Sequence, residues 1–353
     1  MRERDDFDEN AFSSDLMFKV GRLLDDGLLL ATSDCIVKTA NSAAVRFLGE
    51  GMVGKSLFDI FSANKLGGKI EIPAIGEKES EFIFRPESAV PREFTVRVTT
   101  LGDGQIIAML LDMTLQRNLE KVRRDFVANV SHELRSPLTS LAGFIETILV
   151  NDIRDHETTH RFLTIMDEEA RRMSRLIDDL LSLSRVEVDE HIIPTDTVPL
   201  LKVVGAVIDS LGDRANRRDM TIKLIDRRET VPGNTVMFGH SDEINEVFHN
   251  LIENAVKYGF ENSEIMVDIE MRTPELISIA VTNQGEPIAE KHLSRLTERF
   301  YRVDKARSRQ IGGTGLGLAI VKHIINRHRG SLTIDSVDGA TTFTVEFPVF
   351  ERP

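Results

Sequence analysis

The sequence predicts a multidomain α+β protein with a strand-rich first module, an antiparallel helical hairpin and a layered α/β domain at the end. Short apolar runs separated by Gly, Asn, Asp and Pro come first. Two long seams of apolar residues at three- and four-residue steps follow, and helical and strand patterns then alternate. The length of 353 residues also exceeds what one core usually organises.

The composition is that of a globular intracellular protein. No run approaches the roughly 20 apolar residues of a membrane span, and the first residues, MRERDDFDEN, do not resemble a secretory signal. The single cysteine, Cys35, forms no internal disulfide and fits a reducing compartment. A net charge of −13 disfavours broad binding to nucleic acid or anionic membranes. We therefore expect a soluble, cytoplasmic chain with no transmembrane segment and no direct nucleic-acid partner.

The first two domains differ in their periodicity. Residues 1–15 are polar and predicted to be disordered, whereas residues 16–114 contain the strand-like runs GLLLA, EFIFR, FTVRV and QIIAMLL. Residues 115–188 carry two helical seams separated by NDIRDHETTH, which predicts a hairpin. One hairpin cannot bury both seams, so we expect two copies to form a dimeric four-helix bundle.

The C-terminal domain is predicted over residues 200–353, after a linker at 189–199 that contains Pro194 and Pro199. Its helical patterns cover residues 200–214, 242–258 and 317–328. Between and after them lie the strand-like runs TIKLI, EIMVDIEM, LISIAV, SLTI and TFTVEF. This alternation predicts a layered α/β architecture.

The segment FVANVSHELRSPLTSL places His132, Arg135, Ser136 and Thr139 on one polar helix face. An exposed neutral imidazole is a nucleophile, and an adjacent carboxylate such as Glu133 can take its second proton and stabilise the cation formed during attack. Most exposed helical histidines are merely solvated side chains, so the context decides. HELRSPL resembles the H box of sensor histidine kinases. That resemblance implies that His132 is the phosphoacceptor, Glu133 the general base, and Ser136 the residue that positions water when a partner is dephosphorylated.

Four later segments carry a second signal. In HNLIENAVKYG, Asn250 and Asn254 lie one helical turn apart, and GGTGLGLAIV is a glycine-rich turn opening a helix that can hold phosphate. It lacks the ending of a P-loop and follows no strand, which disfavours Walker and Rossmann sites. With TNQGEPI and RFYRVD, these segments resemble the N, G1, F and G2 boxes of the histidine-kinase ATP-binding domain, which has a GHKL-type (Bergerat) fold.

The resemblance implies ATP and Mg²⁺ as cofactors, Asn254 as the metal ligand, and transfer of the phosphoryl group to an aspartate of a response regulator. The implied nucleotide-binding residues are Asn250, Asn254, Lys257, Tyr258, Asn283, Gly285, Phe300, Arg302, Gly313, Thr314, Gly315, Leu316 and Gly317. The basic run containing Lys305, Arg307 and Arg309 is either a solvated loop or a triphosphate clamp.

The G1 segment departs from the family pattern. Asn283 stands where the family carries the aspartate that accepts a hydrogen bond from adenine, and Pro287 replaces a glycine. An amide oxygen still accepts such a bond, but without the charge that strengthens it. A pseudokinase scaffold or partner phosphatase is therefore the alternative function. Another ATPase of the same superfamily is a third, which the HELRSPL helix disfavours.

Residues 16–114 resemble a PAS sensor domain, with Asn41, Ala44 and Gly49 carrying the match. Neither a flavin-reactive cysteine nor a haem-binding histidine stands out there. HELRSPLTSL and LTERFYRVDKARSR are most similar to phosphate-regulon sensor kinases.

Overall fold

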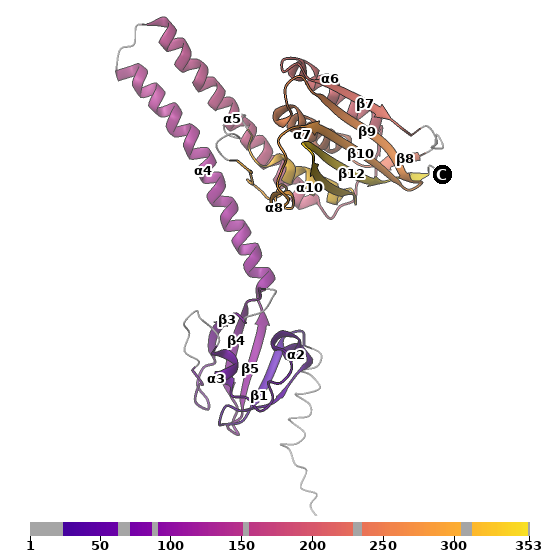
Figure 1. Cartoon of the computed structure of the whole chain (residues 1–353). Helices are drawn as coiled ribbons and strands as arrows, with labels where there is room; N and C mark the ends of the chain where they lie inside the picture. Colours follow the sequence, from indigo (N-terminus) through magenta and orange to yellow (C-terminus); the bar gives the residue numbers. More distant parts are fainter. Residues whose placement is uncertain are drawn as a thin grey trace, which may run out of the picture. The chain divides into compact units, whose positions relative to one another are not determined.

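The computed structural model describes residues 24–62, 71–86, 91–150, 155–228, 235–304 and 313–351. The predicted disordered segment 1–15 and the basic residues Lys305, Arg307 and Arg309 lie outside the described residues. The chain divides into two compact units, residues 1–128 and 129–353. Helix α4 (Thr114–Val150) belongs to both, because it runs through the boundary without interruption (Figure 1).

The first unit is built on a five-stranded antiparallel sheet in the order β2-β1-β5-β4-β3. The strands are β1 (Gly27–Ala31), β2 (Val37–Ala40), β3 (Ser80–Phe84), β4 (Phe94–Thr100) and β5 (Ile106–Asp112). Four of them coincide with the predicted strand runs. Two short helices, α2 (Ser42–Leu48) and α3 (Leu57–Phe61), were not predicted. Asn41 caps α2 by accepting from the amide of Ala44, and it also accepts from the amide of Leu28 on β1.

Aromatic side chains make up much of the core that packs on this sheet. The Phe61 ring packs edge-on against Phe82 and Phe84, with centroids 5.4 and 5.0 Å apart. Phe94 is fully buried beside Phe47. The alternation of buried and partly exposed residues along β4 and β5 is that of a sheet with one face on a core.

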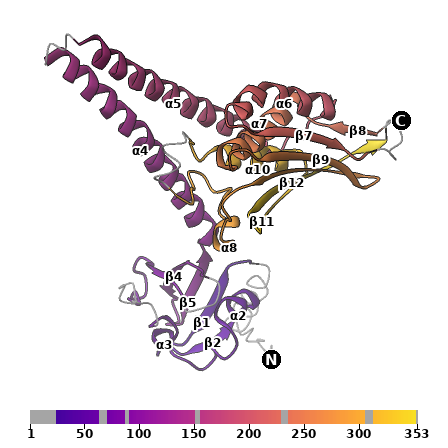
Figure 2. The ribbon, with the colours of Figure 1, turned by 45° about the horizontal axis from the view of Figure 1, so that its top comes forward.

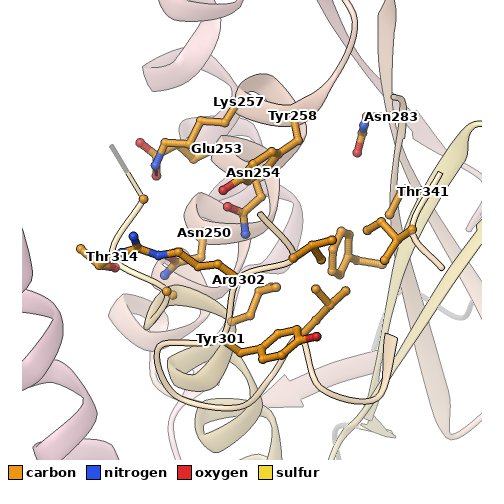
Figure 3. Close-up of a pocket in the computed structure, with 18 of the residues that line it drawn as sticks. Asn250, Glu253, Asn254, Lys257, Tyr258, Asn283, Tyr301, Arg302, Thr314 and Thr341 are labelled. Atoms are coloured by element: carbon orange, nitrogen blue, oxygen red, sulfur yellow. Dashed lines mark hydrogen bonds and ion pairs between the residues drawn. The ribbon is translucent and has the colours of Figure 1, made fainter. Parts of the chain in front are cut away.

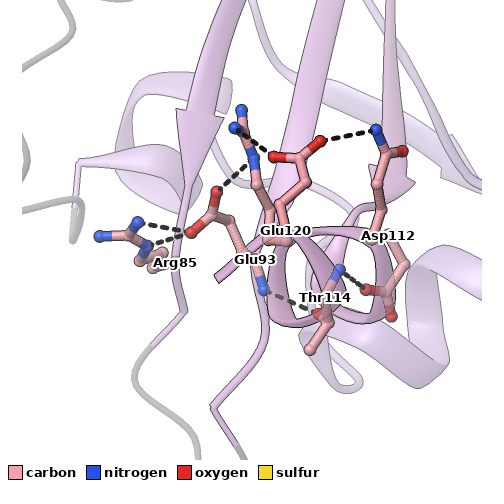
Figure 4. Close-up of polar contacts among 7 residues, drawn as sticks. Arg85, Glu93, Asp112, Thr114 and Glu120 are labelled. Carbon is pink, nitrogen blue, oxygen red and sulfur yellow. Dashed lines mark hydrogen bonds and ion pairs between the residues drawn. The ribbon is translucent and has the colours of Figure 1, made fainter. Parts of the chain in front are cut away.

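A polar cluster joins this sheet to the start of α4. The Glu93 carboxylate accepts from Arg85 at 2.6 Å and pairs with Arg117 at 3.2 Å, so it ties β4 to the first turn of the helix. The Glu93 amide donates to the Thr114 hydroxyl, and the Thr114 amide donates to Asp112 (Figure 4). A side chain of β5 and a side chain of α4 therefore hold the end of the strand and the beginning of the helix in place.

The second unit begins with the predicted hairpin, formed by α4 and α5 (His156–Asp189). Asp155 caps α5 by accepting from the amides of Glu157 and Thr158. Along the seams, Leu138, Ile145 and Ile177 are each between 45% and 59% exposed. The hairpin thus presents apolar surface that the single chain leaves uncovered. None of the helices in the described parts of the chain is long and apolar enough to cross a membrane.

The rest of this unit is a sheet covered on one face by three helices (Figure 2). The helices are α6 (Leu200–Asn216), α7 (Ser241–Tyr258) and α10 (Gly317–Arg327), with a short α8 (Glu290–Leu293). The main sheet runs β11-β12-β10-β9-β7, and only β7 and β9 are parallel. Its strands are β7 (Thr221–Asp226), β9 (Glu264–Thr273), β10 (Leu276–Gln284), β11 (Ser331–Val337) and β12 (Ala340–Pro348). The predicted α/β layering is confirmed.

Part of the segment predicted as a linker, residues 189–199, forms a strand of a small second sheet. We predicted a linker there, but Thr197–Val198 forms β6, which pairs with β8 (Thr235–Phe238), and β13 (Phe350–Glu351) pairs with β8 from the other side. A two-residue strand is too short to show an alternating pattern, and its partner lies far along the chain.

The fully buried side chain of His328 joins α10 to the start of α7. Its Nε2 accepts from the amide of His240, the residue before α7, at 3.0 Å. The Nδ1 therefore carries the proton and donates to the Ile324 carbonyl at 2.8 Å. Burial lowers the pKa of His328, although Glu243 lies 3.8 Å from Nδ1. The ring is held neutral in one tautomer.

This arrangement predicts a pH-dependent stability. Below about pH 6.5, the ordinary pKa of histidine, the unfolded chain binds a proton that the folded ring resists, so the free energy of unfolding should fall. We expect His328→Gln to be less stable by about 1–3 kcal/mol at pH 7.5. Denaturant unfolding should show this gap narrowing towards pH 5. His160→Gln, a change at an exposed histidine of α5, is the control and should leave the pH profile unchanged. A constant gap for His328→Gln would contradict the prediction.

Candidate functional site

A cavity of about 520 Å³ opens beside α7 in the second unit (Figure 3). Eleven of the thirteen predicted nucleotide-binding residues line it, although they come from four separate stretches of sequence. They are Asn250, Asn254, Lys257, Tyr258, Asn283, Gly285, Arg302, Gly313, Thr314, Gly315 and Gly317. The other two, Phe300 and Leu316, are not among the lining residues. The volume is in the range of small-molecule sites.

Helix α7 supplies one wall because its two faces differ. Seven apolar residues of this helix are buried in the core, whereas Asn250, Glu253, Asn254 and Lys257 face the cavity. Glu253 pairs with Lys257 at 2.7 Å and with Arg214. Burial acts to raise the pKa of Glu253, but these two cations outweigh it, so the pKa lies below the ordinary value. The Lys257 charge is therefore shared with a carboxylate before any phosphate arrives.

The two asparagines offer oxygen atoms to a cation. The Asn250 side-chain amide donates to the Glu246 carbonyl at 3.0 Å, which leaves its oxygen facing Gly317 at the start of α10. Asn254 makes no hydrogen bond through its side chain within the described ranges. No group of three acidic, histidine or cysteine ligands exists there either. This donor set fits Mg²⁺, which takes few protein ligands and completes its shell with phosphate oxygens and water.

The glycine-rich segment is pinned at its described end. Gly315 adopts φ +77°, and its carbonyl accepts from the amide of Phe300, a non-glycine residue with φ +62°. Thr314 donates through its hydroxyl to Asp179 of α5 at 2.5 Å. Burial raises the pKa of Asp179, which lines the cavity together with Arg175. Leu316 is fully buried at the N-cap of α10, so it anchors the segment and does not line the cavity.

The predicted catalytic residues lie on α4 and not in the cavity. His132 and Ser136 are exposed, as expected for a reactive face, and α4 continues through Pro137. Glu133 pairs with Arg172 of α5 at 3.2 Å and with Arg302 at 3.5 Å. Because Arg302 also lines the cavity, one residue links the histidine-bearing helix to the nucleotide site.

Further polar contacts join α5 to the catalytic part. Arg299 pairs with Glu187 at 2.6 Å, His323 with Glu190 at 2.9 Å, and Ser182 donates to Glu246 at 2.6 Å. The sequence patterns predicted none of them. All six partners are polar and partly buried, and periodicity does not say which polar residues meet.

The remaining end of the cavity is formed by the sheet. Asn283 and Thr341 are directly opposed on β10 and β12, and each is only 5% exposed. Thr341 was not predicted. A signal existed, because the alternation of TTFTVEF places it on the same face as Phe343, and a polar residue at a core position is unusual. Tyr301, whose hydroxyl lies 2.5 Å from His292 Nδ1, was also missed.

Comparisons with known proteins agree with this geometry. Residues 122–188 match the model of the His Kinase A (phospho-acceptor) domain. Residues 239–351 match that of the histidine kinase-, DNA gyrase B- and HSP90-like ATPase. The phosphate regulon sensor protein PhoR of Pseudomonas aeruginosa is 36% identical over 335 residues, which are 92% of this chain and 72% of PhoR. The sensor protein kinase WalK of Staphylococcus aureus is 32% identical over 329 residues, 90% of this chain and 77% of that protein.

A solved structure shares the fold. The histidine kinase ThkA, crystallised in complex with the response regulator protein TrrA, matches with a TM-score of 0.52 at 20% identity. The match covers 91% of this chain and 95% of ThkA. With both domain models matched and the likeness to PhoR spanning most of either protein, this chain belongs to the sensor histidine kinases and is a protein-histidine kinase.

Proposed function

We propose that this protein uses Mg²⁺-ATP to phosphorylate His132 and then transfers the phosphoryl group to an aspartate of a response regulator. The observation that carries this proposal is the pairing of Glu133 with Arg302. Arg302 lines the cavity, and Glu133 directly follows the exposed His132 in α4. An ion pair therefore joins the residue next to the proposed acceptor to the proposed ATP site.

The reaction follows from the chemistry of these groups. A ring nitrogen of neutral His132 attacks the γ-phosphorus, the bond to the bridging oxygen breaks, and ADP leaves. Glu133 accepts the proton from the other ring nitrogen, for which it must exchange at least one of its two arginine partners. Asn254 would hold Mg²⁺, with Asn250 beside it, and the ion would neutralise phosphate charge. Arg302, released from Glu133, is placed to contact the phosphates.

Partners are proposed from the surfaces of the hairpin. ThkA was crystallised with a response regulator, and the hairpin here presents an exposed polar face around His132 for such a partner. The exposed apolar residues Leu138, Ile145 and Ile177 favour homodimerisation as a four-helix bundle. The Ser136 hydroxyl is available to orient water for dephosphorylating the partner.

The first unit is proposed to be a PAS-like sensor in a cytoplasmic protein. The sheet order β2-β1-β5-β4-β3 and the Asn41 cap of α2 support this reading, since Asn41 was one of the residues that carried the resemblance. The side chains around Glu93 tie the sheet to α4. Rearrangement of the sheet would then act on α4 as a rotation or shift.

Loss of the phosphoacceptor tests the reaction. Incubation with γ-labelled ATP and Mg²⁺ should produce an acid-labile label on the wild type, and His132→Gln should lower it at least about 100-fold because the nucleophile is gone. His160→Gln, on the exposed surface of α5 in the same hairpin, should keep full labelling. Absence of label from the folded wild type would favour a scaffold or partner phosphatase, the alternative raised by Asn283 and Pro287.

A substitution at Gly317 tests the nucleotide site. A Cβ atom there would lie 2.3 Å from the Asn250 oxygen, so Gly317→Ala must displace that side chain or the start of α10. We expect an overpacking cost of about 1–3 kcal/mol in unfolding and weaker Mg²⁺-ATP binding by calorimetry. In Gly205→Ala, the added methyl group meets nothing within 4 Å, and helix propensity favours alanine. If both variants bind ATP equally well, Asn250 has no role at this site.

Insertions in α4 test the coupling. One residue added after Leu119 turns the downstream helix by about 100° relative to the sensor, whereas seven residues turn it by only about 20°. We expect the single insertion to change the basal rate of His132 labelling and the seven-residue insertion to preserve it. ATP affinity should be unchanged in both. Identical rates in all three proteins would rule out coupling through helix rotation.

A further inference from the structure

One end of the cavity, which we call the base end, is formed by Asn283 and Thr341. These two residues are paired across β10 and β12, next to the apolar pairs of the core. Along β10, Ile277, Ile279 and Val281 point to the helix-covered face and are at most 3% exposed. Their partners on β12 are Phe347, Val345 and Phe343, which are also buried. The fourth pair, Asn283 opposite Thr341, lies on the same face of the sheet but is polar. Apolar packing therefore ends where this pair begins.

The side-chain amide of Asn283 makes no hydrogen bond to any residue that the structure describes. The residue as a whole is only 5% exposed, and its side chain lines the cavity. Both polar atoms of this amide are thus available to a molecule bound in the cavity. Such a group in a cavity wall is satisfied when a ligand supplies the missing partner. Gly285 leaves room for it, because a Cβ atom there would lie 3.1 Å from the Asn283 amide nitrogen.

The charges of the cavity separate its two ends. Lys257, Arg302 and the glycine-rich segment form the end suited to phosphates. Asn283 and Thr341 lie together, away from Thr314 and Asn250 (Figure 3). Phe343, two residues after Thr341 on β12, also lines the cavity. An apolar wall with two neutral polar groups suits a nucleobase.

The chemistry of an amide decides which base it can read. A carboxylate only accepts hydrogen bonds, so it favours the 6-amino group of adenine and repels the 6-oxo group of guanine. An amide accepts at one end and donates at the other, and a half-turn about its terminal torsion exchanges them. No described neighbour fixes which end faces the cavity. The Thr341 hydroxyl, held 3.1 Å from Ser336, likewise has both donor and acceptor capacity.

We infer that the base subsite around Asn283 accepts 6-oxopurine nucleotides, GTP included, alongside ATP. This inference rests on the proposed function, because it assumes that the cavity holds a nucleoside triphosphate. It assigns Asn283 as the residue that sets base selectivity: the amide donates to O6 of guanine or accepts from N6 of adenine. Neither base then leaves a buried polar group unpaired at this position.

Calorimetric titration of the full chain with ADP and with GDP, each with Mg²⁺, tests the inference without turnover. We expect the two dissociation constants to agree within about threefold. Asn283→Asp should tighten ADP and weaken GDP, so that their ratio shifts at least about tenfold towards ADP, as expected for one discriminating contact. Asn262→Asp makes the same charge change on an exposed turn and should leave the ratio unaltered.

Distinct outcomes separate the inference from the proposed function. A wild type that binds ADP more than tenfold tighter than GDP overturns the inference, as does an unchanged ratio in a folded Asn283→Asp protein. If that variant does not fold, Asn283→Ser serves instead, since its smaller hydroxyl reads both bases and should keep the ratio near one. Failure of both nucleotides to bind would refute the proposed function itself. Loss of His132 labelling with intact binding would leave the base inference standing.

Discussion

The packing of α7 sets the geometry on which the second unit depends. One face of this helix is buried in the core and the other lines the cavity, so the positions of Asn250 and Asn254 follow from the same 3.6-residue period that buries Phe248 and Leu251. Both ends are held by distant residues. His328 accepts from the amide before the first turn. Arg218 donates to the carbonyls of Val256 and Lys257 in the last turn and of Gly259 just after it. The ligand-facing side chains are thus positioned by contacts that no ligand touches.

The contacts between the hairpin and the catalytic part have a different character. Leu183 and Val186 are buried on α5, but around them lie hydrogen bonds and ion pairs such as Arg299 with Glu187. Partly exposed ion pairs are individually weak, so they exchange partners at low cost. The Glu133 carboxylate already holds two guanidinium groups. A polar, exchangeable interface is what a kinase requires if the same helix must meet ATP at one step and another protein at the next.

How much could be predicted from the sequence depends on the range of the interaction. The long helices α6, α7 and α10 repeat their pattern over many residues, and they begin and end within two residues of the predicted bounds. Short elements such as β6 and α3 have no room for a pattern. The glycines and asparagines of the site were found because each sits in a local segment of defined chemistry. Asp179, Arg175 and Thr341 were missed, since their role arises only when α5 and β12 are brought beside α7.

The two ends of the cavity are consequently held in place by different parts of the fold. Asn283 and Thr341 belong to the strand pair β10–β12, so their positions are fixed by the same sheet that carries the buried core residues. Thr314 and Arg302 instead contact Asp179 and Glu133 on the hairpin, so a rearrangement of the hairpin would act on them directly. A change transmitted along α4, as we propose, would therefore act first on the phosphate end. Base recognition can stay constant while the alignment of the transferred phosphate is regulated, which separates how tightly a nucleotide is held from how fast it reacts.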